Sequence, residues 1–211
     1  MAYKFKLWMM LAGALGVMAQ IGSGQEFNLS PTFAGRAVAL QETITNLTPV
    51  TLADTGTAPS LGGERQSAVN GIAPFPGGIA LNLYAITLAS GNQSRSQSSL
   101  AGLDVAFGGH RVTAQWVEAI ATAQSGFLNV PVSGSITVNN LTVDGVPIAV
   151  TGAANQTIDL PNGYVIINEQ TSSSNRGAGE ITVNAIHFVV TGVGDAILAS
   201  ATAQVTTAPT R

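Results

Sequence analysis

The side chains that could carry acid–base chemistry are few in this 211-residue sequence. It contains two histidines, eleven acidic residues and no cysteine. His110 follows Gly108-Gly109, a dipeptide typical of a tight turn, so we expect an exposed loop histidine rather than a catalytic base or a metal ligand. His187 lies between Ile186 and Phe188 in an alternating apolar stretch. It is therefore expected to be a core or sheet-face histidine with one hydrogen-bond partner.

Neither nucleophilic catalysis nor a metal centre is predicted from these groups. A serine hydrolase of the common type would show a nucleophile motif such as G-x-S-x-G, which this sequence lacks. Transition metals need clustered histidine, cysteine or carboxylate ligands, and that spacing is also missing. The nearest approach to a calcium site is a set of acidic residues in or near expected turns, interpreted as solvated carboxylates because no D-x-D-x-D loop holds them. They are Asp144, Asp159, Glu169 and Asp195. The sequence therefore predicts no catalytic residue, no cofactor and no metal ligand, and it does not decide whether a weak calcium site exists.

Two other groups bear on ligand binding. The triplet Asn168-Glu169-Gln170 lies at an expected strand end, where such side chains satisfy neighbouring backbone groups. A hydrolase, the least favoured alternative, would depend on Glu169 or His187. Trp116 and Tyr84 would stack on sugar rings if one sheet exposed both of them, although an isolated aromatic residue in a sandwich usually belongs to the core.

The composition indicates a sheet protein without nucleic-acid partners. Hydrophobic residues make up 45% of the chain and charged residues 9%, against about 25% charged in typical soluble domains. The formal net charge is −3 and no run of basic residues occurs, so the electrostatic footprint of a DNA- or RNA-binding protein is missing.

Apolar residues alternate along the chain rather than recurring at helical spacing, which predicts an antiparallel β-sandwich, jelly-roll-like, with little or no helix. The clearest strand is 180–191. Strict alternation places residues 181, 183, 185, 187 and 189 on one face and 186, 188 and 190 on the other, and both faces are mostly apolar near the strand end. Such a strand is typical of a sandwich interior.

The other expected strands are separated by turn dipeptides. They span 34–44, 79–89, 111–123, 135–143, 147–151, 156–160, 164–170 and 195–205. Asp144-Gly145 and Asn162-Gly163 are dipeptides that accept the positive φ angles of tight hairpins, and Gly108-Gly109 and Gly192–Asp195 can serve similarly. Polar or Pro/Gly-rich segments are predicted to be irregular connections. These segments are 70–78, 92–99 and 171–179.

The N-terminus has the pattern of a secretory signal peptide, expected over residues 1–24. Two lysines precede a thirteen-residue apolar run, Leu7–Ala19, which is shorter than the roughly 20 residues that cross a bilayer. Cleavage is expected after Ala19 or Gly24. The sequence ends in TTAPTR, without an apolar anchor or an LPxTG motif. We therefore expect a secreted or periplasmic protein, associated with the cell surface by non-covalent contacts if at all.

The rest of the chain is predicted to form one domain. A flexible leader covers 25–32, a single β-sandwich domain covers 33–205, and a short tail covers 206–211. A faint similarity between AIATAQ at 119–124 and LASATAQ at 198–204 suggests two similar halves that meet near 125–134.

Sheet edges are usually protected by charge, particularly by lysine. The only lysines in this sequence, Lys4 and Lys6, would be lost with the signal peptide. Edge strands with so few charges are open to pairing with another copy, and the leader could add a strand to a neighbour. The sequence therefore predicts self-association, and the alternative is a monomer whose edges are covered by loops.

Several segments resemble one family of bacterial exported proteins. They are SITVNNLTVDGVPIAVTGAANQTIDLP at 135–161, INEQ at 167–170, GEITVNAIHFVVTG at 179–192 and DAILASATAQV at 195–205, with weaker motifs FAGRAVAL at 33–40 and GGHRVTAQWVEAIATA at 108–123. The series is similar to the choice-of-anchor P family. The resemblance implies an exported surface protein and no known catalytic residues.

We therefore expect a non-enzymatic structural or interaction module outside the cell or in the envelope, capable of self-assembly. A carbohydrate-binding module or adhesin is the alternative, and a hydrolase is the third. Partners would be other copies of the chain or surface glycans.

Overall fold

The computed structural model describes residues 30–126 and 128–207. The expected signal peptide, most of the expected leader and the last four residues of the tail lie outside this range. No helix in the described part is long and apolar enough to cross a membrane.

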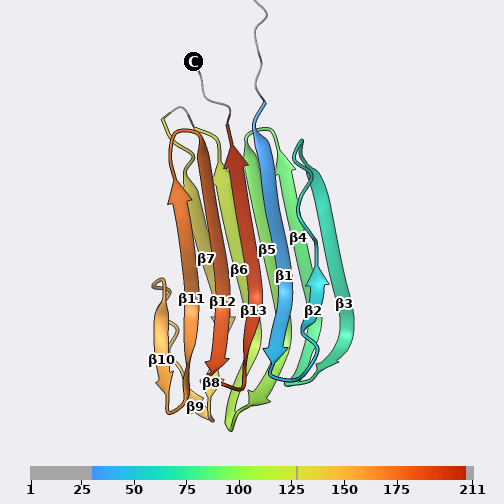
Figure 1. The fold of residues 1–211 in the computed structure, drawn as a ribbon, viewed down its shortest axis with the longest axis vertical. Coiled ribbons are helices and arrows are strands. Elements are labelled where there is room, and N and C mark those ends of the chain that lie inside the picture. The colour runs from blue at the N-terminus through green and yellow to red at the C-terminus, as the bar shows by residue number, and fades with distance from the viewer. Residues whose placement is uncertain (1–29, 127, 208–211) are drawn as a thin grey trace, which may run out of the picture.

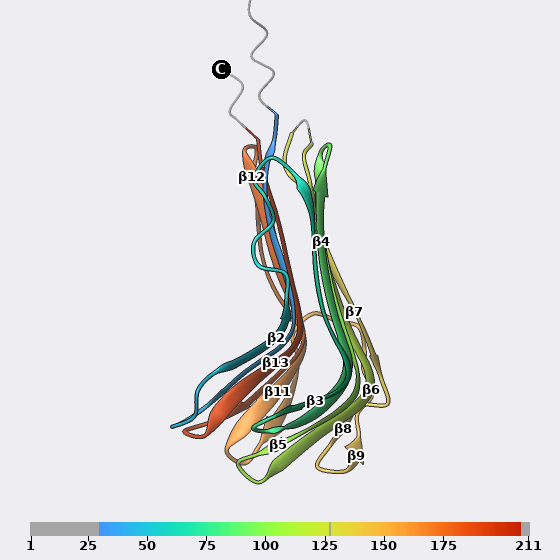
Figure 2. The same cartoon turned by 90° about the vertical axis from the view of Figure 1, so that its right-hand side faces the viewer.

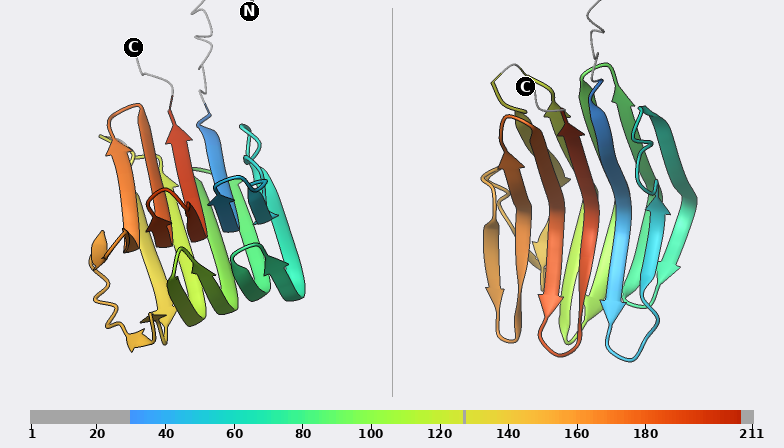
Figure 3. Two further views of the ribbon diagram at one scale, coloured as in Figure 1. Left: turned by 60° about the horizontal axis from the view of Figure 1, so that its bottom comes forward. Right: turned by 45° about the horizontal axis from the view of Figure 1, so that its top comes forward.

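Two antiparallel sheets pack face to face, which confirms the predicted β-sandwich (Figures 1 and 3). The first, here called the β12 sheet, contains in spatial order β10 (Gln156–Leu160), β11 (Gly163–Ser174), β12 (Ala178–Val190), β13 (Gly194–Thr206), β1 (Thr32–Ile44) and β2 (Val50–Asp54). The second, the β5 sheet, contains β3 (Gly63–Phe75), β4 (Gly78–Ser90), β5 (Gln93–Phe107), β6 (His110–Gln124), β8 (Thr142–Val143) and β9 (Val146–Pro147). β7 (Val132–Asn139) pairs with the remaining part of β6.

Most predicted strands are confirmed. Parts of two observed strands had been predicted as irregular segments, and a third observed strand had not been predicted. The second half of β3 lies in the predicted Pro/Gly connection 70–78, the first half of β5 lies in the predicted polar loop 92–99, and β2 matches no predicted strand. The predicted loop 171–179 is mostly the paired ends of β11 and β12. The predicted strand 135–143 is interrupted at residues 140–141, where Asn140 has a φ of 53°, and its two parts belong to β7 and β8. The predicted strand 147–151 contributes only its first residue, to β9.

The turn predictions are confirmed in position and partly in conformation. Gly108 and Gly109 have φ values of 60° and 85° between β5 and β6, and Asp144 and Gly145 have 50° and 78° between β8 and β9. The β10–β11 hairpin also turns where predicted. Its Asn162-Gly163 dipeptide is not in the left-handed region, so the reason given for that turn is wrong.

Both sheets bend sharply at mid-length, which divides the sandwich into a terminal arm, near the ends of the chain, and a distal arm, near β8 and β9 (Figure 2). In the β12 sheet the bend follows one transverse row, at the single position that four of the five strand pairings skip; the short β10–β11 pairing is continuous. There Ala53, Ala199 and Asn168 have φ values of 49°, 58° and 55°. An L-residue rarely adopts this left-handed conformation, which breaks the regular pleat.

Because of the bend, the predicted assignment of β12 residues to two faces by strict alternation is wrong. The row crosses β12 at Ala185, and the inward-facing set changes phase there: Ile181, Val183 and Ala185 are buried on one side of the row, and Ile186, Phe188 and Val190 on the other. Strict alternation had assigned these residues to opposite faces. β12 therefore has one apolar face rather than two, and its outward face is free for polar residues.

The interiors of the two arms differ in side-chain size. In the terminal arm the two sheets approach each other closely. A Cβ atom added to Gly35 would lie only 2.9 Å from Ser94 Oγ and from Thr87 Cγ2 of the opposite sheet. The distal arm contains most of the largest buried side chains, including Phe107 and Phe188, whose rings stack with centroids 4.3 Å apart. The first half of β5 was not predicted as a strand because its inward residues in the terminal arm are serines, so the sequence shows no alternation of apolar and polar residues there.

Candidate functional site

The bend assembles a polar cluster on the outer face of the β12 sheet, which is the inside of the bend (Figure 2). His187 lies three residues beyond Asn184 on β12, and Asn184 is opposite Glu169 on β11. In a flat strand, residues three apart are about 10 Å apart and point to opposite faces. The change of phase at Ala185 and the curvature bring all three side chains to the same place.

Glu169 joins the two residues of β12. Its Oε2 accepts a 2.6 Å hydrogen bond from the Asn184 amide, and the Nδ1 atom of His187 lies 3.1 Å and 3.2 Å from its two oxygens. On the other side of the ring, His187 Nε2 lies 3.8 Å from Asp195 Oδ2. The His187 side chain is 18% exposed. The predicted sheet-face histidine with one hydrogen-bond partner is thus confirmed, and that partner is the glutamate of the NEQ triplet.

This cluster borders a shallow surface hollow of about 550 Å³, lined by His187, Asp195, Tyr164 and Thr43 among others. Tyr164 meets the imidazole edge-on, with ring centroids 6.4 Å apart. Both ring nitrogens of His187 face carboxylates, and in the described part of the chain no hydroxyl is hydrogen-bonded to either. A nucleophilic triad needs a hydroxyl on one of these nitrogens.

His110 occupies a second polar cluster, at the distal end of the sandwich. Its Nδ1 lies 2.7 Å from Asp144 Oδ2 and its Nε2 lies 2.6 Å from Asn162 Oδ1. Asp144 belongs to the β8–β9 turn of one sheet and Asn162 to the β10–β11 turn of the other, so the ring clamps the two sheets together. The side chain is 11% exposed. The prediction of an exposed loop histidine is therefore wrong, because three turns converge on it.

The hydrogen bond to Asp144 raises the pKa of His110 above its ordinary value, with a smaller contribution from Asn162. The same contact lowers the pKa of the Asp144 carboxyl. With oxygen acceptors at both nitrogens, the imidazolium form satisfies the site, because only that form donates from both. His110 is thus a structural contact between the sheets.

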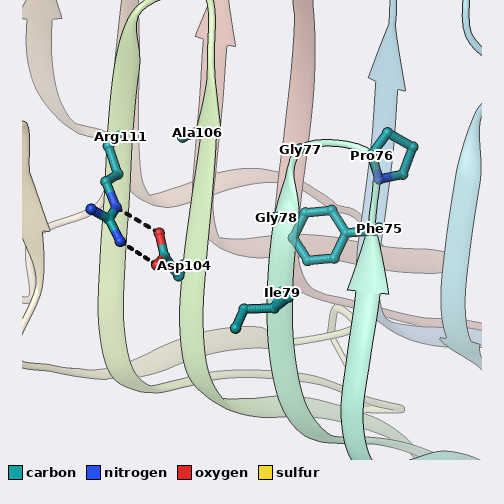
Figure 4. Close-up of a pocket in the computed structure, with 8 residues that line it drawn as sticks. All are labelled: Phe75, Pro76, Gly77, Gly78, Ile79, Asp104, Ala106 and Arg111. Carbon is teal, nitrogen blue, oxygen red and sulfur yellow. Dashed lines mark hydrogen bonds and ion pairs between the residues drawn. The ribbon is translucent and has the colours of Figure 1, made fainter.

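A second hollow, of about 530 Å³, lies over the β3–β4 turn on the β5 sheet (Figure 4). Asp104 and Arg111 form a two-bond ion pair on its rim, and this pair lowers the pKa of Asp104. Behind the turn, Glu42 is 3% exposed. One of its oxygens accepts the Gly77 N–H at 3.1 Å, and the other has no hydrogen-bond partner among the residues that the structure describes. Burial raises the pKa of Glu42.

The remaining residues singled out in the sequence are dispersed. Glu169 and Asp195 flank His187, whereas Asp144 belongs to the His110 clamp and Asp159 lies on β10. In residues 30–126 and 128–207 no group of three or more histidine or acidic residues could hold a metal ion. Sequence reasoning missed Asn184 and Glu42. Strict alternation separates Asn184 from His187, and nothing in the local pattern marks Glu42 as buried.

Tyr84 and Trp116 both face outward from the β5 sheet, on β4 and β6. In register, Tyr84 is opposite Ser99 of β5, and Trp116 is opposite Ala101 of the same strand. Ser99 also faces outward but is only 4% exposed. The two aromatic residues are partly exposed and flank one strand. One sheet therefore presents both aromatic rings, but each ring is half-buried rather than exposed.

The chain matches no family model, no curated protein and no solved structure.

Proposed function

We propose that this chain is a non-enzymatic structural or interaction module, exported to the envelope or the surroundings of a bacterial cell, that assembles with copies of itself. The resemblance to the choice-of-anchor P family and the signal-peptide pattern support export. The observation that carries the self-assembly is an uncharged edge strand, β7.

The edges of the two sheets differ in how they are protected. Among the edge strands of the described chain that are longer than two residues, β7 alone contains neither a charged residue nor proline. β3 is protected in three ways. Arg65 is in register with the fully buried Thr87, on the inward face of the strand, a bulge interrupts the pairing near Asn70-Gly71, and Pro74 follows. These are devices that prevent edge-to-edge association.

The experiment is a size measurement on protein recovered after export. Size-exclusion chromatography with light scattering, over concentrations from about 1 to 500 µM, is expected to show a concentration-dependent dimer or larger assembly. Negative-stain microscopy of the same samples would show whether assemblies are regular. A strictly monomeric species over the whole range would overturn the proposal.

Glycan binding is a second candidate, favoured by the placement of Tyr84 and Trp116 on one outer face. Aromatic rings on a sheet face stack on the apolar faces of sugars. A glycan array followed by calorimetry would identify a ligand, and Trp116→Ala should abolish its binding. Tyr164→Ala, on the other sheet, is the matched control and should leave the binding unchanged. Equal loss in both variants, or no glycan bound by the wild type, would contradict this candidate.

A further inference from the structure

Within residues 30–126 and 128–207, β7 is hydrogen-bonded to another strand on one side only. All of its eight residues pair with β6, and no other strand of this described part pairs with it. On its inward face Val132, Ile136 and Val138 pack against the core but stay partly exposed. Apolar contacts and backbone hydrogen bonds both remain incomplete along this edge, which is the situation that strand addition resolves.

The residues of β7 are complementary to β7 itself. Around Ser135 the strand is partly symmetric: Val132 and Val138 lie three residues from it on either side, and the hydroxyl residues Ser133 and Thr137 lie two residues from it. Two copies placed antiparallel with Ser135 opposite Ser135 would pair inward residues with inward residues, since positions directly opposite share a face. No charge on β7 would oppose its own copy.

This register also pairs the outward residues favourably. Ser133 would lie opposite Thr137 of the second copy, so that hydroxyls face hydroxyls. On the inward side Gly134 would face Ile136, a small residue opposite a large one. A two-fold axis through Ser135, perpendicular to the sheet, relates the copies, as in most closed homodimers.

We propose that two copies of this chain associate through β7, antiparallel and in register at Ser135, to form one continuous sheet from their two β5 sheets. The inference rests on the proposed self-assembly and names its interface. Strand β3 at the opposite edge stays free in this dimer, and its inward arginine, bulge and proline limit further growth.

Cysteine cross-linking tests the register, because the chain has no cysteine of its own. In the proposed dimer the two Cβ atoms at position 135 are about 4.5–5.5 Å apart, so Ser135→Cys should form an intermolecular disulfide on oxidation with copper phenanthroline. Ser133→Cys is the matched control. It is also exposed on the same strand, but its two copies would be roughly 13 Å apart, four residues along the strand. We expect at least tenfold faster cross-linking of Ser135→Cys than of Ser133→Cys.

Charge at the same position tests the interface without a covalent bond. Ser135→Lys and Ser135→Glu should each be monomeric at concentrations where the wild type is dimeric, since like charges would lie directly opposite. An equimolar mixture of the two should dimerise again. Wild-type-like circular dichroism spectra and a cooperative melt would establish that both variants fold, which is expected because position 135 is exposed in the single chain.

The outcomes separate the interface from the self-assembly. If the wild type assembles but both charge variants assemble equally well, or cross-linking is no faster at 135 than at 133, the β7 interface is wrong and the self-assembly stands. If the wild type is monomeric throughout, both are wrong. Monomeric single variants with a dimeric mixture would establish the interface.

Discussion

The clamp at His110 makes the stability of the sandwich depend on pH, and His110→Ala is the perturbation that isolates it. The ring contacts Asp144 at 2.7 Å and Asn162 at 2.6 Å, and it joins turns of two different sheets. A hydrogen bond to a charged group contributes about 1.5–3 kcal/mol. Asp144 is 41% exposed, however, and solvent reduces an exposed ion pair to below about 1 kcal/mol. We therefore expect His110→Ala to lower the free energy of unfolding by about 1–2 kcal/mol near pH 6.

The sign of the pH dependence follows from the direction of the pKa shifts. The folded-state pKa of His110 is raised above its ordinary value of 6.5, so its contribution is complete below that value and is lost as the pH rises through the folded pKa. The pKa of Asp144 is lowered, so its contribution is lost as the pH falls through the depressed value. The clamp is strongest between these two limits, in mildly acidic solution.

Urea denaturation at pH 6 and pH 9 measures the effect. The difference between wild type and His110→Ala should be larger at pH 6 than at pH 9, where the neutral ring donates only one hydrogen bond. Asn162→Ala should reproduce part of the loss at pH 6. An equal loss at both pH values, or a larger loss at pH 9, would refute the reasoning.

Three further substitutions test the interior. Glu42→Gln should raise the free energy of unfolding by about 1 kcal/mol at pH 8, because a carboxyl whose pKa burial raises costs most when ionised, and the gain should shrink towards pH 4 in urea titrations. Gly35→Val should lower it by about 1–3 kcal/mol, since its Cβ would meet Ser94 and Thr87 at 2.9 Å; a neutral result in the same assay would contradict the close sheet packing. Phe188→Ala should lower it by about 3–5 kcal/mol, measured by thermal and urea unfolding, and a loss below 1 kcal/mol would mean that the distal core is not packed as described.

The sequence predicts the sandwich because alternation is local. In β12 and β13 the alternation of apolar residues is visible within a dozen positions of the sequence. A turn such as Gly108-Gly109 is visible in two. Alternation of apolar residues could not predict the first half of β5, because its fully buried residues are Ser94, Ser96 and Ser98 and their neighbours are polar as well. Their burial depends on how closely the opposite sheet approaches, and that distance is set by residues such as Gly35 on another strand.

The candidate site could be predicted only in part, for a related reason. His187 and Glu169 were recognised separately, and the contact between them depends on the bend. The bend in turn depends on a transverse row of left-handed residues from different strands, and two of the three are alanines, a residue type that gives no sign of such a conformation in a sequence.

The bend also explains why a chain with so few charged residues can place polar groups together. Without the change of phase at Ala185, His187 would share a face with Ile181 and Val183, which are buried, and the imidazole would require a partner within the core. With it, the same spacing puts Ile186 and Phe188 inside and directs His187 towards Glu169 on the concave side. The left-handed residues therefore position the polar cluster as well as curve the sheet. Straightening the row would bury His187, expose Phe188 and separate Glu169 from its partner in a single step.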